Sequence, residues 1–530
     1  MCGAEEAVFR DRKINEEDVT MAGQVGILAA IVIYLVAMVY VGFYFSKKGS
    51  GNSADEFYLG GRKLGPLVTA MSAEASDMSS WLLMGLPGVA YLTGISDAGW
   101  TAIGLGLGTY LNWLIVAKRL RRYSVKCNAI TIPDFFSRRF RDEKNILMCI
   151  AAIVILIFFI PYTASGFKAI GTLFSSLFGV EYHVAMIVGA VVIVGYTVMG
   201  GFMAVSTTDL IQSIVMSISL VVIVFYGIHL AGGWDAVMAN ANSLAGYLSM
   251  AQMHDGATNT ASPYSLLTIV STMAWGLGYF GMPHILLRFM AIEDENKLTL
   301  SRRIASIWVV ISMAVAILIG VIGCAASVQG AIPTFATSAE SETVIIRFAH
   351  LLGQHNFLLS LIAGVVLAGI LACTMSTADS QLLTAASGVS QNLLQDFLKI
   401  KMSAKASMMA ARLTVIGIAA VAIFLAWNPD SSVFYIVSFA WAGFGAAFGP
   451  LVLFALFWKR TNMQGALAGM IAGGVMVFVW KYLVRPMGGI WNIYELLPAF
   501  IVSALAIVIV SLLTAAPSKE ICEEFDSVGR

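Results

Sequence analysis

The stretch Ala73-Glu-Ala-Ser-Asp-Met-Ser-Ser-Trp-Leu-Leu-Met-Gly-Leu-Pro87 decides how the rest of this sequence is interpreted. It lies within an apolar region of membrane-spanning length, yet it begins with two carboxylates and three serines, and Gly85, Pro87 and Gly88 follow as helix breakers. A polar group in hydrocarbon costs free energy unless it is paired, so a continuous apolar helix would not contain these residues. We expect a discontinuous transmembrane helix whose unwound centre offers backbone carbonyls and hydroxyls to a bound ion and solute.

Composition places the chain in a membrane. Of its 530 residues, 58% are hydrophobic and 12% are charged, whereas a soluble domain carries about 25% charged residues. The net charge of +1 gives no support for a nucleic-acid partner. The six cysteines are scattered without a C-x-x-C pair, so neither a disulfide framework nor a thiolate metal site is indicated. The sequence predicts an all-α polytopic protein of the cell inner (cytoplasmic) membrane.

The apolar stretches divide the chain into spans of about 20 residues, the length that crosses a hydrocarbon core. We count about thirteen, near 23–45, 66–93, 98–117, 146–176, 183–202, 204–231, 264–290, 304–328, 357–393, 409–427, 432–457, 463–484 and 496–514. Lysine and arginine clusters follow only the odd-numbered spans, which predicts an N-terminus outside and a C-terminus inside. Residues 1–22 are expected to form a flexible tail and 515–530 a cytoplasmic tail.

A second interrupted span contains Trp275-Gly-Leu-Gly-Tyr-Phe-Gly-Met-Pro-His284, with three glycines and a proline. A single stretch of this kind favours a helix kinked at Pro283. Two such stretches five spans apart indicate two inverted five-helix repeats with a binding site between the breaks. The repeats would cover residues 66–231 and 264–457, with 23–45 as an extra N-terminal helix and 463–514 as two C-terminal helices.

Trp275, Tyr279 and Pro283 are spaced at four-residue steps and would share one face of a helix. An aromatic box of this kind suits an apolar ring and holds its ammonium group by cation–π attraction. An aromatic stripe is also common in plain packing. The glycines favour the pocket, because they remove the bulk that a packed core would want.

A third stretch, within span 357–393, carries a polar stripe at three- and four-residue steps: Cys373, Ser376, Thr377, Ser380, Thr384 and Ser387. Ser and Thr can simply bond back to the preceding helical turn, which accounts well for Thr384 and Ser387. It accounts less well for Ser376 and Thr377 beside Asp379, because three adjacent polar groups indicate a wet cavity. Sodium requires several oxygen ligands, and neutral carbonyls and hydroxyls also let the ion leave.

Several motifs resemble the sodium:solute symporter family. They run in the family's order through residues 55–460: Tyr58-Leu-Gly-Gly-Arg62, Ala75-Ser-Asp-Met-Ser79, Gly200-Gly-Phe202 with Asp209, Trp275–Gly281, Met375-Ser-Thr377 and Ala440-Trp-Ala-Gly-Phe-Gly-Ala-Ala-Phe-Gly-Pro450. The resemblance implies a LeuT-type fold and sodium-coupled import of a small zwitterionic solute, foremost L-proline, by alternating access. It implies no enzyme activity, no cofactor, no obligate protein partner and no metal other than sodium as co-substrate.

The resemblance also assigns site residues. Sodium would be held by the carbonyls of Ala75, Met78 and Cys373 and the hydroxyls of Ser376 and Thr377; Cys373 stands where the family usually has alanine. The solute would lie against Trp275, Tyr279, Pro283 and Tyr162, with its carboxylate near Ser79 and Ser80 at a helix N-terminus.

Ser80 and Met282 depart from the glycine and glutamine usual in the family's proline carriers. Pantothenate, a monocarboxylate or another amino acid therefore stays open as the solute. A solute sensor is disfavoured, because the C-terminal tail is too short for a kinase domain.

Charged residues complete the assignment. Asp77 matches a carboxylate that the family needs for sodium dependence, Arg62 is given a role at the inner gate, and Asp209 could assist sodium release. Asp379 and Ser380 fill positions that could hold a second sodium ion. Glu74 either serves a local specialisation or extends to the inner membrane surface.

Overall fold

The computed structural model describes residues 23–44, 58–199 and 201–529, and the predicted tail 1–22 lies outside these residues. The first half comprises the helix Gly23–Tyr44, α3 (Pro66–Asp77), α4 (Leu86–Thr93), α5 (Ile95–Leu111), α6 (Ala117–Lys126), α7 (Ile132–Arg139), α8 (Ile146–Phe178), α9 (Tyr182–Met199), α10 (Phe202–Leu230) and α11 (Trp234–Ser243).

The second half begins with a hairpin of β1 (Gln252–Asp255) and β2 (Thr260–Pro263). It continues with α12 (Leu266–Met273), α13 (Pro283–Ala291), α14 (Leu298–Val328), α15 (Ser338–Ser341), α16 (Val344–Gly353), α17 (Phe357–Ser387), α18 (Ala404–Leu425), α19 (Val433–Phe457), α20 (Met463–Val479), α21 (Leu496–Leu513) and α22 (Lys519–Val528). Short 3-10 or π turns connect several of them, including η1 (Gly60–Arg62), η2 (Trp81–Gly85), η3 (Asn112–Val116), η4 (Ala274–Gly281) and η6 (Gly388–Phe397).

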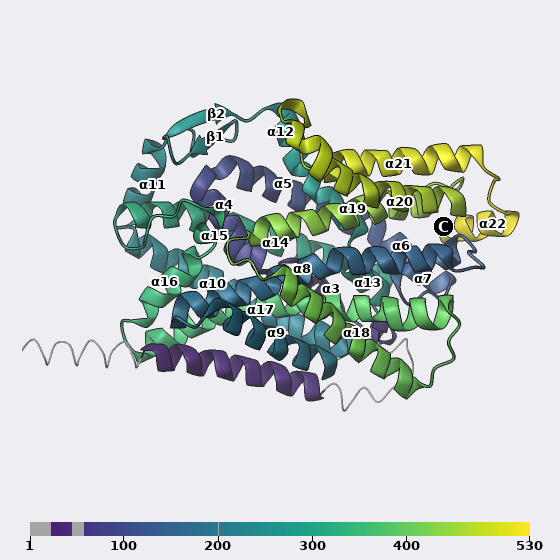
Figure 1. Cartoon of the computed structure of the whole chain (residues 1–530), viewed down its shortest axis with the longest axis horizontal. Coiled ribbons are helices and arrows are strands. Elements are labelled where there is room, and N and C mark those ends of the chain that lie inside the picture. Colours follow the sequence, from purple (N-terminus) through teal and green to yellow (C-terminus); the bar gives the residue numbers. More distant parts are fainter. Residues whose placement is uncertain (1–22, 45–57, 200, 530) are drawn as a thin grey trace, which may run out of the picture.

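The long helices lie side by side, as Figure 1 shows, with the β1–β2 hairpin at one end of the bundle and α22 at the other. In the described part of the chain, ten helices are long and apolar enough to cross a membrane. Three shorter apolar helices are Trp81–Thr93, Tyr182–Gly195 and Leu266–Gly281. The helical membrane class is confirmed, while the count of about thirteen spans and the orientation of the termini stay predictions.

Both predicted breaks are present. The helix α3 ends at Asp77, where Met78 takes the non-helical angles φ −74° and ψ 71°. The chain resumes through the π turn η2, immediately before α4 and its Pro87. A proline inside a helix removes a hydrogen bond and clashes with the carbonyl four residues earlier, and a widened π turn relieves that clash.

The second break lies at Met282, which is extended with φ −76° and ψ 108°. The residue before a proline is disfavoured in the α conformation, so Pro283 sets this break and then begins α13. On its other side the span is not open coil, since Ala274–Gly281 forms a 3-10 helix. The helix α3 packs against α10, α13, α14 and α17, so the first break lies inside the bundle.

Candidate functional site

The break after α3 leaves backbone groups without their helical partners. The Ser79 amide turns to the Asp77 carbonyl instead of the Ala75 carbonyl that a continued helix would offer. The Asp77 carbonyl also accepts hydrogen bonds from Trp81 Nε1 and from the Tyr162 hydroxyl, each at 3.1 Å. Backbone oxygens are thus presented to side chains of other elements in the middle of the bundle.

Three of the five oxygens predicted to hold sodium come together at this break. The Ser376 hydroxyl on α17 donates to the Ala75 carbonyl at 2.7 Å and to the Cys373 carbonyl at 3.2 Å. Thr377 Oγ1 is buried and has no hydrogen-bond partner in the described part of the chain. Neutral oxygens from a broken helix and a facing helix are the donor set that suits a sodium ion that must also leave. Met78, the fifth expected ligand, is the buried residue immediately after the end of α3.

Two members of the polar stripe on α17 behave as plain helix packing. The Thr384 hydroxyl bonds back to the Ser380 carbonyl, and the Ser387 hydroxyl bonds back to the Thr384 carbonyl, each at 2.7 Å. This confirms the simpler interpretation for those two residues.

An aromatic cluster surrounds the break. The Trp275 ring centroid lies 5.8 Å from that of Trp81, 4.9 Å from Phe434 and 5.9 Å from Tyr494. Trp275 Nε1 is buried without a hydrogen-bond partner among the described residues. The cluster therefore combines apolar faces with an available donor.

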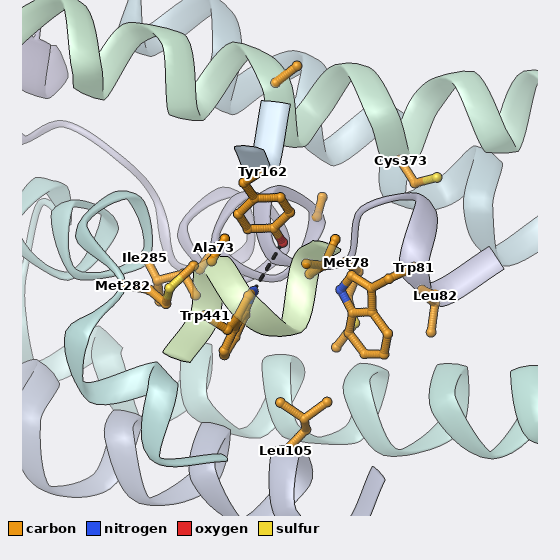
Figure 2. Close-up of a cluster of buried hydrophobic side chains, with 14 of the residues drawn as sticks. Ala73, Met78, Trp81, Leu82, Leu105, Tyr162, Met282, Ile285, Cys373 and Trp441 are labelled. Carbon is orange, nitrogen blue, oxygen red and sulfur yellow. Dashed lines mark hydrogen bonds between the residues drawn. The ribbon is translucent and has the colours of Figure 1, made fainter. Parts of the chain in front are cut away.

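Trp441 closes the other side of this cluster. Its ring lies 5.0 Å from that of Tyr279 and 6.4 Å from that of Trp275, and its Nε1 donates to the Tyr162 hydroxyl at 3.2 Å. Figure 2 shows this bond, with Met78 and Trp81 nearby. The motif Ala440–Pro450 contains Trp441, but the sequence analysis assigned Trp441 no role. The small residues around Trp441 were the signal that could have identified it as a site residue. For Phe434 and Tyr494 the sequence offered none.

Two sequence-based arguments about the span 264–290 were wrong. The spacing of Trp275, Tyr279 and Pro283 in the sequence predicts one shared helical face. This segment is a 3-10 helix, which has 3.0 residues per turn. Residues four apart therefore point about a third of a turn away from each other and do not share a face. Pro283 lies beyond the break at Met282. Trp275 and Tyr279 are brought together by Trp441, not by a shared face.

The glycines of the span 264–290 do not leave open space for a pocket. A Cβ on Gly276 would lie 2.0 Å from the Gly104 carbonyl, one on Gly278 would lie 2.5 Å from the Trp441 ring, and one on Gly281 would lie 2.2 Å from the Phe444 carbonyl. Each glycine lets a neighbouring element approach the backbone closely. They shape the site by positioning Trp441 and α5.

The two carboxylates of α3 are both buried. The Tyr279 hydroxyl donates to Asp77 Oδ2, which ties the first break to the second. Glu74 Oε1 accepts from Trp113 Nε1 at 2.9 Å, and the Glu74 side chain is 1% exposed. The alternative that Glu74 extends to the inner surface is therefore wrong.

Ser79 and Ser80 follow the break and begin the second half of the span 66–93. Ser80 Oγ is buried and has no partner within the described ranges. Ser79 Oγ accepts a long hydrogen bond of 3.5 Å from the Trp81 amide. Both serines immediately precede Trp81 of the aromatic cluster, and a solute carboxylate is expected at these hydroxyls.

The Asp209 carboxylate forms an ion pair with a side chain of the protein itself. Arg288 of α13 reaches Asp209 Oδ2 at 3.2 Å and donates to the Ser380 hydroxyl at 2.6 Å, while the Ser72 hydroxyl donates to Asp209 at 2.7 Å. The Arg288 charge lies where a second sodium would have to bind, so this geometry disfavours a second ion between Asp209 and Ser380. Sequence reasoning missed Arg288.

Asp379 does not join this group, because its Oδ1 accepts from the Thr197 hydroxyl of α9. The proposed second-ion pair of Asp379 and Ser380 therefore has its two members bonded to different partners.

Arg62 connects the elements at the end of the bundle that carries α6 and α7. Its guanidinium donates to the Met290 carbonyl at 2.7 Å, the Ala129 carbonyl at 2.6 Å and the Ser124 hydroxyl at 3.1 Å. Gly60, Gly61 and Arg62 all have positive φ, at 63°, 59° and 56°. Only glycine adopts these angles freely, which explains Gly60 and Gly61, while Arg62 takes the left-handed conformation against its preference. The turn directs Arg62 between α6 and α13.

Comparison with known proteins agrees with this geometry. Residues 57–473 match the sodium:solute symporter family. The sodium/proline symporters of Staphylococcus aureus strains USA300 / TCH1516 and JH9 are 40% identical to the chain over 495 residues, covering 92% of each protein.

Two solved structures share the fold. One is a substrate-bound, outward-open Na⁺-coupled sialic acid symporter, with a TM-score of 0.74 and 19% identity over 93% of this chain and 99% of that one. The other is MHP1, a nucleobase-cation-symport-1 family transporter in a closed conformation with bromovinylhydantoin bound, with a TM-score of 0.54 and 13% identity over 89% and 99%. The helical architecture is thus that of LeuT-fold-like sodium symporters. The family match and the 40% identity together place the chain in the sodium:solute symporter family, with sodium as co-substrate.

Proposed function

We propose that this sodium-coupled symporter imports L-proline by alternating access across the cell inner membrane. The observation that carries the proposal is the Ser376 hydroxyl, which lies between the Ala75 and Cys373 carbonyls beside the broken end of α3. Similarity to sodium/proline symporters supports proline as the solute.

The sodium site in this proposal consists of the carbonyls of Ala75, Met78 and Cys373 and the hydroxyls of Ser376 and Thr377. Asp77 couples this site to the solute, because its carboxylate accepts from Tyr279 of the second broken span. At 100 mV, each co-transported sodium contributes roughly 2.3 kcal/mol to uptake before its concentration gradient is counted.

The solute site lies between the two breaks. Trp275, Tyr279 and Tyr162 would contact the apolar ring and the ammonium group, with Pro283 at the start of the following helix. Ser79 and Ser80 would donate to the carboxylate, and the buried hydroxyl of Ser80, which has no hydrogen-bond partner among the described residues, supports this assignment. Arg62 would hold the inner gate through its bonds to Met290 and Ala129.

Uptake of labelled L-proline into liposomes that hold only this protein tests the proposal. An inward sodium gradient should drive accumulation, and an equal potassium gradient should not. The stoichiometry should be one sodium per solute, since Arg288 already neutralises Asp209.

A different solute is the second candidate, because Ser80 and Met282 depart from the proline carriers. Competition with pantothenate, monocarboxylates and other amino acids separates the candidates. Proline should compete at the lowest concentration, and a stronger competitor would replace it as the substrate.

The N-terminus outside and the C-terminus inside are part of the proposal. Cys522 on α22 is partly exposed. In right-side-out vesicles of a variant that keeps Cys522 alone, an impermeant thiol reagent should label it only after the membrane is opened.

A further inference from the structure

The helix α5 packs against the end of α12 and against η4 through a regular stripe. A Cβ on Gly104 would lie 2.4 Å from the Met273 carbonyl, and one on Gly108 would lie 2.3 Å from the Gly276 carbonyl. Four residues further, Asn112 Nδ2 donates to the Tyr279 carbonyl at 3.0 Å. Four-residue steps on an α-helix thus match three-residue steps on a 3-10 helix, which fixes the register between the two elements.

The next residue turns to the other broken span. Trp113 Nε1 donates to Glu74 of α3 at 2.9 Å, and the Trp113 ring lies 4.4 Å from that of Phe289 on α13. Asn112 is 0% exposed and Trp113 is 3% exposed. Two adjacent buried residues therefore hold one side chain of α3 and one carbonyl of η4.

Together with one further hydrogen bond, these contacts connect α3, η4 and η3 to one another. The Tyr279 hydroxyl donates to Asp77, and Asp77 lies one helical turn from Glu74 on α3. Asn112 and Trp113 bond to both of these elements and begin the π turn η3. We call this pair of residues the coupling corner. Single π turns within α-helices are frequent at functional sites, because they re-aim side chains at a local cost.

We propose that Asn112 and Trp113 are positioning residues that couple sodium binding at the α3 break to solute binding at η4. This inference rests on the proposed function. Coupling requires that one ligand change the other site's geometry, and a shared corner bonded to both elements transmits such a change. Without the corner, only the bond between Tyr279 and Asp77 still joins the two breaks, so both ligands still bind but sodium strengthens solute binding less.

The test measures labelled L-proline binding to the purified full chain with sodium and with choline. The ratio of the two dissociation constants is the coupling factor, about 5- to 150-fold in typical coupled sites. In Asn112→Leu and in Trp113→Phe this factor should fall about fivefold or more. Sodium binding alone, followed as thermal stabilisation of the protein, should persist in both variants.

The double variant distinguishes coupling from a packing defect. If both residues serve one corner, Asn112→Leu combined with Trp113→Phe should lower the factor no further than the stronger single change. Independent packing defects would instead add. Trp308→Phe is the matched control, because Trp308 Nε1 also makes a 2.9 Å bond, to Ser217, but between α14 and α10. Its coupling factor should equal that of the wild type.

Failure of this inference differs from failure of the proposed function. A wild-type protein whose proline binding ignores sodium would reject the proposed function. Wild-type coupling that persists undiminished in Asn112→Leu or Trp113→Phe, or that falls equally in Trp308→Phe, would reject the coupling corner alone.

Discussion

Removing the Ser376 hydroxyl is the most informative single change to the cation site. This hydroxyl satisfies the Ala75 carbonyl, whose helical donor, the Ser79 amide, is bonded to the Asp77 carbonyl instead. In Ser376→Ala the buried carbonyl loses its partner, which should lower the stability of the sodium-free protein by about 1–3 kcal/mol.

The same change removes one sodium ligand. A contact between a hydroxyl and a charged group contributes about 1.5–3 kcal/mol, equivalent to roughly 10- to 150-fold in affinity. The vacated Ala75 carbonyl binds the ion without competition and offsets part of this loss. We therefore expect the sodium concentration for half-maximal proline uptake to rise about tenfold.

Ser387→Ala is the matched control on the same helix. The Ser387 hydroxyl bonds to the Thr384 carbonyl at 2.7 Å, but that carbonyl also accepts from the Gly388 amide. The control should lose little stability and keep its sodium dependence. Sodium-titrated uptake and thermal unfolding with and without sodium provide both readouts. An unchanged sodium requirement in Ser376→Ala, or an equal rise in both variants, would refute the assigned site.

Three further variants test the remaining parts of the site. Trp275→Ala removes the ring that four other aromatic rings contact, and should weaken proline binding while sodium-induced thermal stabilisation persists. Gly278→Ala brings a Cβ to 2.5 Å from Trp441 and should destabilise the protein by about 1–3 kcal/mol, seen as a lower melting temperature. Arg288→Met leaves the Asp209 carboxylate buried without its cation, which should cost about 3–5 kcal/mol by the same assay; a melting temperature within error of the wild type would contradict the ion pair's role.

The sequence predicted the two breaks because their cause is local. Buried carboxylates and serines cannot lie on a lipid-facing helix. A proline also disfavours the helical conformation at the residue before it, which is why Met282 is extended. The same local chemistry predicted that Ser376 and Thr377 would differ from Thr384 and Ser387.

The sequence could not predict contacts that depend on how distant elements meet. Gly276 and Gly278 were interpreted as open space, but Gly104 and Trp441 fill it, and no local pattern identifies which neighbour approaches a glycine. The 3-10 winding of Ala274–Gly281 changed the face that each aromatic residue presents.

The buried partners of the charged residues were also beyond local reasoning. Glu74 finds Trp113, and Asp209 finds Arg288, each through a pairing of residues far apart in the chain. Composition shows that a buried charge needs a partner but not which partner it meets.

A cryo-electron microscopy map of the full chain with saturating sodium and L-proline tests the central claim most directly. We predict a cation density in contact with the Ala75 and Cys373 carbonyls and the Ser376 and Thr377 hydroxyls, and a proline density beside Trp275. A cation bound away from the end of α3, or α3 continuing into α4 as an unbroken helix, would contradict the account.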